Sequence, residues 1–410
     1  MIGIAIATSQ NSAGLDPAAS AFIQATGITG ATQQAAIDTL VKGLKSDGLW
    51  SKMKAVYPFV TDIVNLFGFS NDFANAAWIK FPSTVVANSI ANPIDGSLNA
   101  STLNFVSGLF YNSVGNTGAS SGTFSGYVKN NGAQFIQIYD SSNGYVNFDI
   151  INYSVTFSDT MTGTITPLAN GWCKITVTKP TQYFVNNIFL SVTSSGTSGR
   201  DSNKISGSLY LYAFQVQIGL VATSYQNNVG SAQAYIANQF KYNLKDPRDL
   251  DAAFRLVFNG GWTHSSTGAT PNGTNGYADT FYNPSASGQL NSAHVSYYSR
   301  TNSNGTEVEI GVERPITNFQ LLEIRTAGLT YFYMNQGGGL GIADANSLGY
   351  YIGNRTASNV VNGFKNGTKI NNASTSSILL PNAKIYLAAY NQSNNTAAAF
   401  STKQSAFATI

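Results

Sequence analysis

Apolar and polar residues alternate with a period of two along most of the chain. The alternation begins at about Phe69 and recurs in short segments, one of which is 173–178. Successive side chains of a β-strand point to opposite faces of the sheet, so the pattern predicts half-buried strands. In 173–178 we expect Cys173, Ile175 and Val177 to form the buried face, with the cysteine acting as a small buried hydrophobic residue.

A second kind of strand is expected at 209–218. Both alternating sets of side chains are apolar or aromatic over much of this segment. A run that is apolar on both faces is typical of a fully buried strand, so we predict a strand at the centre of its sheet. Strict alternation would give it these two faces: Leu209, Leu211 and Ala213 on one side, and Tyr210, Tyr212, Phe214 and Val216 on the other.

Tight-turn signals separate the expected strands. The dipeptide Asn-Gly is the strongest short hairpin signal, because both residues tolerate positive φ. Many short strands joined by tight turns predict β-sandwiches or jelly rolls, and boundaries are expected near 67–70 and near Asn228. Asn-Gly pairs begin at Asn131, Asn143, Asn170, Asn259, Asn272, Asn275, Asn304, Asn362 and Asn366.

The first sixty or so residues have a helical pattern instead. Asp16 followed by Pro17 predicts a helix start, and Gly27 predicts its end. A second, amphipathic helix is expected from about Thr32 to Lys45, because apolar residues recur there at spacings of three and four. These apolar positions are Ile37, Leu40, Val41 and Leu44.

A third helical piece is expected to follow. It would carry Leu49, Trp50, Met53 and Val56. It should end just before Pro58, because the residue that precedes a proline disfavours the α conformation.

Composition narrows the classes of partner. Only 10% of the 410 residues are charged, against about 25% in an average soluble domain, and the formal net charge is +3. Without a basic cluster along one face, we expect no nucleic-acid partner, and without a long apolar span we expect no membrane partner. Cys173 is the only cysteine and no metal-ligand spacing is present, so we expect no metal and no cofactor.

Four segments carry a first resemblance. They are 71–80 (NDFANAAWIK), 126–129 (GYVK), 170–174 (NGWCK) and 213–225 (AFQVQIGLVATSY). The series resembles the carbohydrate-binding-module-like β-sandwich of tail and other structural proteins of bacteriophages. Gln217 stands where that family usually has an acidic residue. The resemblance implies that Trp78 and Trp172 hold the sandwich core together.

A second resemblance lies on either side of the first. Its segments are 57–59 (YPF), 242–249 (YNLKDPRD), 260–264 (GGWTH), 272–278 (NGTNGYA) and 350–355 (YYIGNR). They resemble phage and prophage virion proteins whose C-terminal part is a concanavalin A-like or laminin-G-like sandwich. In that family the first two segments lie close together, which implies that the first module is inserted in the second.

The expected fold is therefore mainly β. It consists of two β-sandwich, jelly-roll-like modules, one inserted in the other, plus a short N-terminal helical segment. The expected bounds are 1–66 for the helical segment, 67–228 for the inserted carbohydrate-binding-module-like sandwich, and 229–410 for the concanavalin A-like or laminin-G-like sandwich that completes the outer domain.

A candidate glycan site lies between Trp262 and Tyr277. Sugar recognition uses an aromatic face against the apolar side of a ring, with amides and backbone groups for the hydroxyls. The site would consist of Trp262, His264, Asn272, Asn275 and Tyr277. In the alternative interpretation the two larger aromatics belong to the core and the Asn-Gly pairs only form turns.

An enzymatic interpretation rests on Glu307, Glu309 and Glu313. Their even spacing places them on one strand face, and retaining glycoside hydrolysis needs two carboxyl groups about 5 to 5.5 Å apart. The spacing differs from that of concanavalin-like glucanases, and a solvated acidic strand face is the alternative. We therefore expect no catalytic residues.

The two resemblances together imply a bacteriophage virion surface protein, a fibre, spike or decoration component. It would be made in the cytoplasm of the host bacterium and act on the virion surface. Its expected partners are host cell-surface polysaccharide and other virion proteins, and its expected assembly is a homotrimer. Two other hypotheses are a purely structural virion subunit without receptor binding and a polysaccharide depolymerase.

Overall fold

The computed structural model describes residues 14–62, 65–114, 121–228, 230, 232–314, 317–339, 341–392 and 396–410. Its fold is mainly β, with 43% of residues in strands and 12% in helices, as predicted. The chain divides into two compact units. The outer unit comprises residues 1–62 and 236–410, and the inserted unit comprises residues 63–235.

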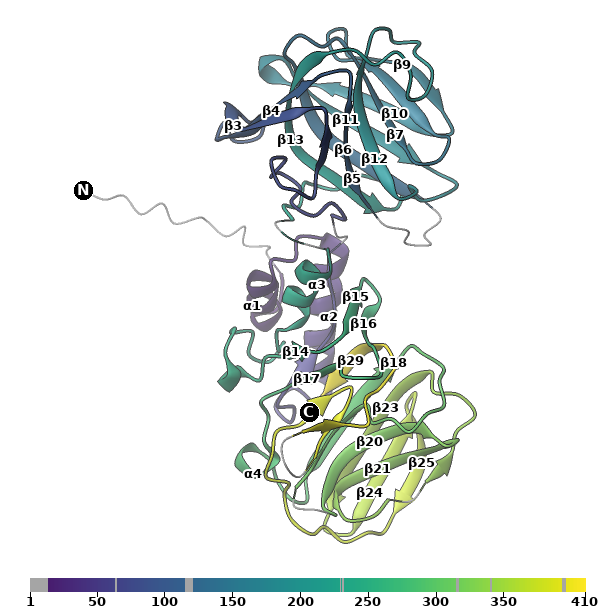
Figure 1. Cartoon of the computed structure of the whole chain (residues 1–410). Helices are drawn as coiled ribbons and strands as arrows, with labels where there is room; N and C mark the ends of the chain where they lie inside the picture. Colours follow the sequence, from purple (N-terminus) through teal and green to yellow (C-terminus); the bar gives the residue numbers. More distant parts are fainter. Residues whose placement is uncertain are drawn as a thin grey trace, which may run out of the picture. The chain divides into compact units, whose positions relative to one another are not determined.

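The inserted unit is a sandwich of two six-stranded antiparallel sheets (Figure 1). The first six-stranded sheet has the order β10 (Thr162–Pro167), β11 (Trp172–Lys179), β6 (Gly122–Asn130), β13 (Gly207–Ile218), β4 (Leu98–Phe105) and β3 (Thr84–Ala91). The second has the order β2 (Ile79–Phe81), β5 (Leu109–Ser113), β12 (Asn187–Thr193), β7 (Phe135–Asp140), β8 (Tyr145–Asp149) and β9 (Ser154–Asp159). One hydrophobic core draws on both sheets.

Trp78 and Cys173 both lie in this core, as predicted. The indole of Trp78 is 2% exposed and stacks on Phe110 with ring centroids 4.9 Å apart. Cys173, Ile175 and Val177 are fully buried on one face of β11, which confirms the predicted alternation. Burial raises the pKa of the Cys173 thiol to about 12, so it stays protonated and unreactive near neutral pH.

Strand β13 is central, as predicted, but its two faces differ from the prediction. The register shifts between Tyr212 and Gln215, and Ala213 has a φ of 54°. A bulge of this kind adds one residue to the strand, so every side chain after it lies on the face opposite to the one that strict alternation predicts. The inward face therefore consists of Leu209, Leu211, Phe214 and Val216.

The N-terminal helices of the outer unit follow the predicted pattern. α1 (Pro17–Thr26) begins at the N-cap Asp16, whose side chain accepts a hydrogen bond from the Ala18 N–H, and ends at Gly27 with a φ of 69°. α2 (Ala31–Ser46) buries Ile37 and Val41. Leu40 and Leu44 pack against the same cluster.

The third predicted helix is wrong. Val56 and Tyr57 form the short strand β1 (Val56–Tyr57), which pairs with Thr409 and Ala408 near the end of the sequence. Asn243 also accepts a hydrogen bond from the Val56 N–H at 2.9 Å. The three- and four-residue spacing is local, whereas these partners lie far away in sequence, so tertiary pairing overrides the local signal.

The outer unit is also a sandwich. Its eight-stranded sheet has the order β15 (Trp262–Ser265), β16 (Gly268–Pro271), β29 (Ser405–Thr409), β18 (Ala293–Ser299), β23 (Gly349–Ala357), β24 (Val360–Lys365) and β25 (Thr368–Ala373), with β1 beside β29. Its nine-stranded sheet has the order β14 (Val257–Asn259), β17 (Tyr277–Asp279), β26 (Tyr386–Leu387), β19 (Ile310–Glu313), β20 (Phe319–Thr326), β21 (Leu329–Gln336) and β22 (Ile342–Ala343). β27 (Tyr390–Asn391) runs parallel to β19 and pairs with β28 (Ala397–Ala398).

Short helical elements complete the two units. They are α3 (Ala232–Phe240), α4 (Pro284–Ser287), η1 (Ala169–Gly171) and η2 (Asp251–Ala253). The sheets of the outer unit approach closely, because a Cβ atom at Gly363 of β24 would lie 2.3 Å from the Phe332 ring of β21.

The Asn-Gly pairs have several different structural roles. The pairs at Asn143, Asn170 and Asn366 lie between hydrogen-bonded neighbouring strands, as the hairpin signal predicts. The pair at Asn131 joins strands of different sheets, and the pair at Asn362 lies inside β24. Asn-Gly therefore predicts hairpins correctly at only some of its positions.

Candidate functional site

The predicted site between Trp262 and Tyr277 consists of the hairpin β15–β16 followed by a turn that leads into β17. Trp262 is partly exposed, and its indole N–H donates to the main-chain oxygens of Asn259, at 3.0 Å, and Tyr277, at 3.3 Å. The polar atom of the indole is thus satisfied within the protein. Tyr277 is also partly exposed and packs on Tyr386, with ring centroids 4.7 Å apart.

His264 is buried within this site. Its side chain is 5% exposed and lies edge-on to Phe258, with ring centroids 4.7 Å apart. Burial lowers the pKa of His264 to about 4, so the imidazole is neutral at physiological pH. The structure therefore gives His264 a position in the packing beneath Trp262.

The amides of Asn272 and Asn275 shape the turn. The Asn272 side-chain oxygen accepts the backbone N–H groups of Thr274, Asn275 and Gly276. Its amide nitrogen donates to the Asn275 side-chain oxygen at 2.8 Å, which also accepts the N–H of Gly261. Both asparagines are exposed, but these hydrogen bonds are local. A glycan role for Trp262, His264, Asn272, Asn275 and Tyr277 stays a prediction.

The acidic residues Glu307, Glu309 and Glu313 do not form a solvated strand face. Glu309 and Lys403 are fully buried, and the Lys403 ammonium group lies 3.1 Å from Glu309 and 2.9 Å from Glu307. Glu313 is 7% exposed and accepts the Thr317 N–H. The alternation predicted that these carboxylates share one strand face, which is wrong: only Glu313 lies in β19, and the distant Lys403 pairs with the other two.

Burial and pairing with Lys403 shift the pKa values of Glu307 and Glu309 in opposite directions. Burial raises the pKa of Glu309 to about 7, although Lys403 and the Ile324 N–H stabilise its charged form. Hydrogen bonds from Lys403 and Thr402 outweigh burial at Glu307, whose pKa is lowered. The carboxylates are occupied by protein groups, which favours a structural role.

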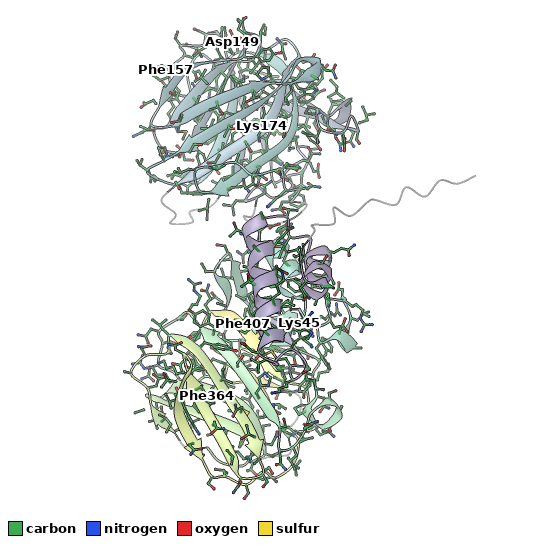
Figure 2. The ribbon with its side chains drawn as sticks, turned by 180° about the vertical axis from the view of Figure 1, so that it is seen from behind. Lys45, Asp149, Phe157, Lys174, Phe364 and Phe407 are labelled. Carbon is green, nitrogen blue, oxygen red and sulfur yellow. The ribbon has the colours of Figure 1, made fainter. Side chains whose placement is uncertain are left out.

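A second candidate site lies on the outward face of the first six-stranded sheet of the inserted unit. Lys174 of β11 lies in register with Tyr127 of β6, which lies in register with Tyr212 of β13. The three side chains form one row across three strands. Figure 2 labels Lys174 in this sheet.

A second row extends this surface. Trp172, Lys129 and Tyr210 are aligned across the same strands, and the Lys129 ammonium group lies 5.9 Å from the Tyr210 ring centre. Trp172 is 2% exposed, but it clusters with Tyr212 and not with the sandwich core. Trp172 is buried in a hydrophobic cluster, as predicted, but this cluster is separate from the one that contains Cys173, because Cys173 takes the inward position on β11.

The first row lines a cavity of about 510 Å³. Tyr212 lies between Tyr127 and Tyr225, with both pairs of ring centroids 6.1 Å apart. The other lining residues are Ile94, Lys174, Ala222, Thr223 and Ser224. This surface, formed by Tyr127, Lys174, Tyr212 and Tyr225, is called the tyrosine face below.

The polar groups of the tyrosine face suit a hydroxyl-rich ligand. Burial raises the pKa of Tyr127, and burial together with the charge of Asp95 raises the pKa of Tyr212, so both phenols stay protonated. Lys174 forms no ion pair within the described part of the chain. The face therefore presents aromatic rings, phenolic hydroxyls and one free cation.

The sequence contained a signal for this face that the glycan hypothesis did not use. Tyr127 and Lys174 alternate with the buried Val128 and Cys173 in two of the segments that carry the first resemblance. An aromatic residue alternating with core residues points outward. Only the strand order could show that these outward residues form one row.

No helix among the described residues is long and apolar enough to cross a membrane. The same part of the chain contains no group of three or more His, Cys, Asp or Glu side chains placed to hold a metal ion. No protein-family model matches the sequence, and it has no significant match among curated proteins.

Proposed function

We propose that the protein is a bacteriophage virion surface component, of the fibre, spike or decoration type, which binds host cell-surface glycans through the tyrosine face of its inserted unit. The observation that carries the proposal is the row of Lys174, Tyr127 and Tyr212 along a cavity of about 510 Å³. The resemblance of this unit's sequence to the carbohydrate-binding-module-like β-sandwich of phage structural proteins supports it.

The chemistry of the face fits a sugar better than it fits a peptide or a nucleic acid. A tyrosine ring can cover the apolar face of a pyranose while its hydroxyl donates to or accepts from the sugar hydroxyls. Lys174 adds a donor whose ammonium group forms no ion pair among the described residues and is therefore available to a sugar hydroxyl. A single lysine gives too little positive charge for phosphate-backbone binding, which depends on many such contacts.

The proposal is tested by a glycan array with the full chain and its variants. We expect Tyr127→Ala to lower affinity by roughly tenfold, because an aromatic contact contributes about 0.5–1.5 kcal/mol beyond its buried area. Lys174→Ala should lower affinity as well. Phe157→Ala is the matched control, because Phe157 is 41% exposed on β9 of the second sheet and stacks on Tyr145.

The array also separates the alternatives. If Trp262→Ala abolishes binding and Tyr127→Ala does not, the ligand binds at the hairpin of the outer unit. If the wild-type chain binds no glycan, the purely structural virion role is favoured. Release of reducing sugar that Glu309→Gln abolishes would instead establish a depolymerase.

Assembly and location are part of the proposal. A weak single site is effective when several copies act together, so a homotrimer on the virion surface would raise avidity. Sedimentation measurements on the purified chain test the trimer. Labelling of intact particles with an antibody against the inserted unit tests whether the tyrosine face is accessible beside other virion proteins.

A further inference from the structure

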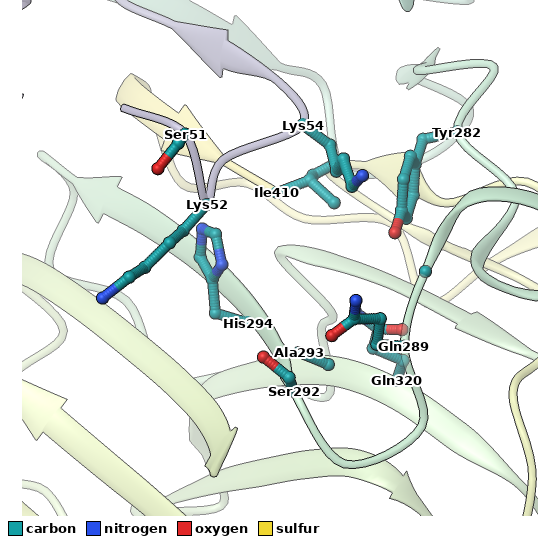
Figure 3. Close-up of a pocket in the computed structure, with 11 residues that line it drawn as sticks. Ser51, Lys52, Lys54, Tyr282, Gln289, Ser292, Ala293, His294, Gln320 and Ile410 are labelled. Carbon is teal, nitrogen blue, oxygen red and sulfur yellow. The ribbon is translucent and has the colours of Figure 1, made fainter. Parts of the chain in front are cut away.

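The outer unit contains a separate polar cavity of about 240 Å³. Figure 3 shows it, with Lys52 and Lys54 on the segment before β1, His294 on β18, and Tyr282 and Gln289 opposite them. Neither lysine forms an ion pair within the described residues. None of the residues that line the cavity has an acidic side chain.

Tyr282 and Gln320 also line the cavity. The two residues are 4% and 2% exposed. Their side chains offer a hydroxyl and an amide that can hydrogen-bond to the oxygen atoms of a bound ligand.

The segment that carries the lysines is held firmly in place. The Ile410 carbonyl oxygen accepts the backbone N–H groups of Lys54 and Ala55, at 2.6 and 3.0 Å. Asn243 accepts the Val56 N–H and donates to the Lys54 oxygen. The two ammonium groups therefore extend from an anchored backbone.

A second cavity of about 440 Å³ adjoins the first, because Lys52, Ser292, Ala293 and His294 line both. Its other lining residues include the apolar or aromatic side chains of Leu49, Met53, Tyr350 and Ile352. His294 donates to or accepts from Thr409 at 3.1 Å and has a pKa lowered to about 4 by burial, so it is neutral. Lys52 and Arg355 also line the larger cavity, so both cavities have cationic groups, while the larger one has in addition the apolar side chains named above.

We propose that these adjoining cavities bind an acidic saccharide. The carboxylate of one sugar residue would lie in the smaller cavity, against the ammonium group of Lys54 and the hydroxyl of Tyr282, and Lys52, which lines both cavities, would add its charge where they adjoin. The next sugar residue would pack over Tyr350 and Ile352 in the larger cavity. This site is independent of the tyrosine face, whose expected ligand is a hydroxyl-rich glycan.

The experiment uses the full chain with Tyr127→Ala and Lys174→Ala, which together weaken binding at the tyrosine face and remove its free cation. The probes are oligomers of glucuronic and galacturonic acid, the methyl esters of the same oligomers, and inorganic phosphate. The acids should bind, and esterification should lower affinity by tenfold or more, because hydrogen bonds to charged groups are worth roughly twice as much as neutral ones.

Variants locate the binding. Lys54→Gln should lower the affinity for the acids by roughly tenfold or more, since it removes a charge-assisted contact. Tyr282→Phe, which removes only a hydroxyl, should lower it by a smaller factor. Lys369→Gln is the matched control, because it removes the same charge from an exposed position on β25 that lines neither cavity.

Three results would overturn the proposal. They are binding of esters and acids with equal affinity, binding of phosphate as tight as that of the acids, and equal losses from Lys54→Gln and Lys369→Gln. Failure of every acidic probe to bind would also overturn it. None of these results bears on the tyrosine face, which is tested with uncharged glycans on the chain that retains Tyr127 and Lys174.

Discussion

At the scale of single residues, the buried His264 should make the outer unit sensitive to acid. Its pKa falls from an ordinary value near 6.5 to about 4 because burial disfavours the charged imidazolium. The folded state therefore binds fewer protons than the unfolded state between these pH values. The free energy of unfolding is therefore at its full value above about pH 6.5 and falls by up to about 3 kcal/mol as the pH falls toward 4.

A comparison of the wild type with His264→Gln tests this prediction. The variant should be the less stable of the two at pH 7.5, and the difference in free energy of unfolding should shrink as the pH falls toward 4. Denaturant unfolding of both chains at several pH values gives the comparison. Parallel stability curves would show that His264 does not titrate as proposed.

A second residue-scale prediction concerns Lys403. Its removal leaves the carboxylates of Glu307 and Glu309 without their counter-charge, and breaking a buried ion pair in this way costs about 3–5 kcal/mol. Glu309→Gln should lower the free energy of unfolding much less, because Lys403 keeps its ion pair with Glu307 and because burial already disfavours the charged form of Glu309. Free energies of unfolding for Lys403→Met and Glu309→Gln test the contrast, and equal losses would contradict it.

At the scale of elements, the sequence predicted what depends on local geometry. Alternation identified β11, and the Asp16 and Gly27 caps identified α1, because a cap and a pleat are set by neighbouring residues. It missed β1, which depends on pairing with β29 far along the chain. It also missed the row of Lys174, Tyr127 and Tyr212, since side-by-side placement depends on strand order.

The bulge in β13 gives an element-scale prediction. A one-residue change of register moves every following side chain to the opposite face, so deletion of Ala213 should turn Phe214 and Val216 away from the core. We expect the inserted unit to lose its cooperative unfolding transition. Ala213→Gly is the control, because glycine tolerates the φ of 54° and keeps the bulge. Calorimetry of both variants tests this, and a folded deletion variant would refute it.

At the scale of the whole molecule, the two units should fold independently. The ends of the inserted unit are tied together within it, because the Asn228 amide donates to the Asn65 oxygen at 2.9 Å and the Ser70 N–H donates to the Asn228 oxygen at 2.9 Å. The ends of the outer unit are likewise joined, since Thr61 and Gln239 share a buried hydrogen bond. An insertion whose ends are close together leaves its host able to close without it.

Two proteins test this independence. One consists of residues 63–235 alone, and in the other a short Gly/Ser linker replaces these residues. Each should give a single cooperative thermal transition that matches one transition of the full chain. The first should keep binding of uncharged glycans and its sensitivity to Tyr127→Ala, and the second should keep binding of acidic saccharides and its sensitivity to Lys54→Gln. If either protein folds but loses its ligand, that ligand needs residues from both units, and the assignment of one site to each sandwich would be wrong.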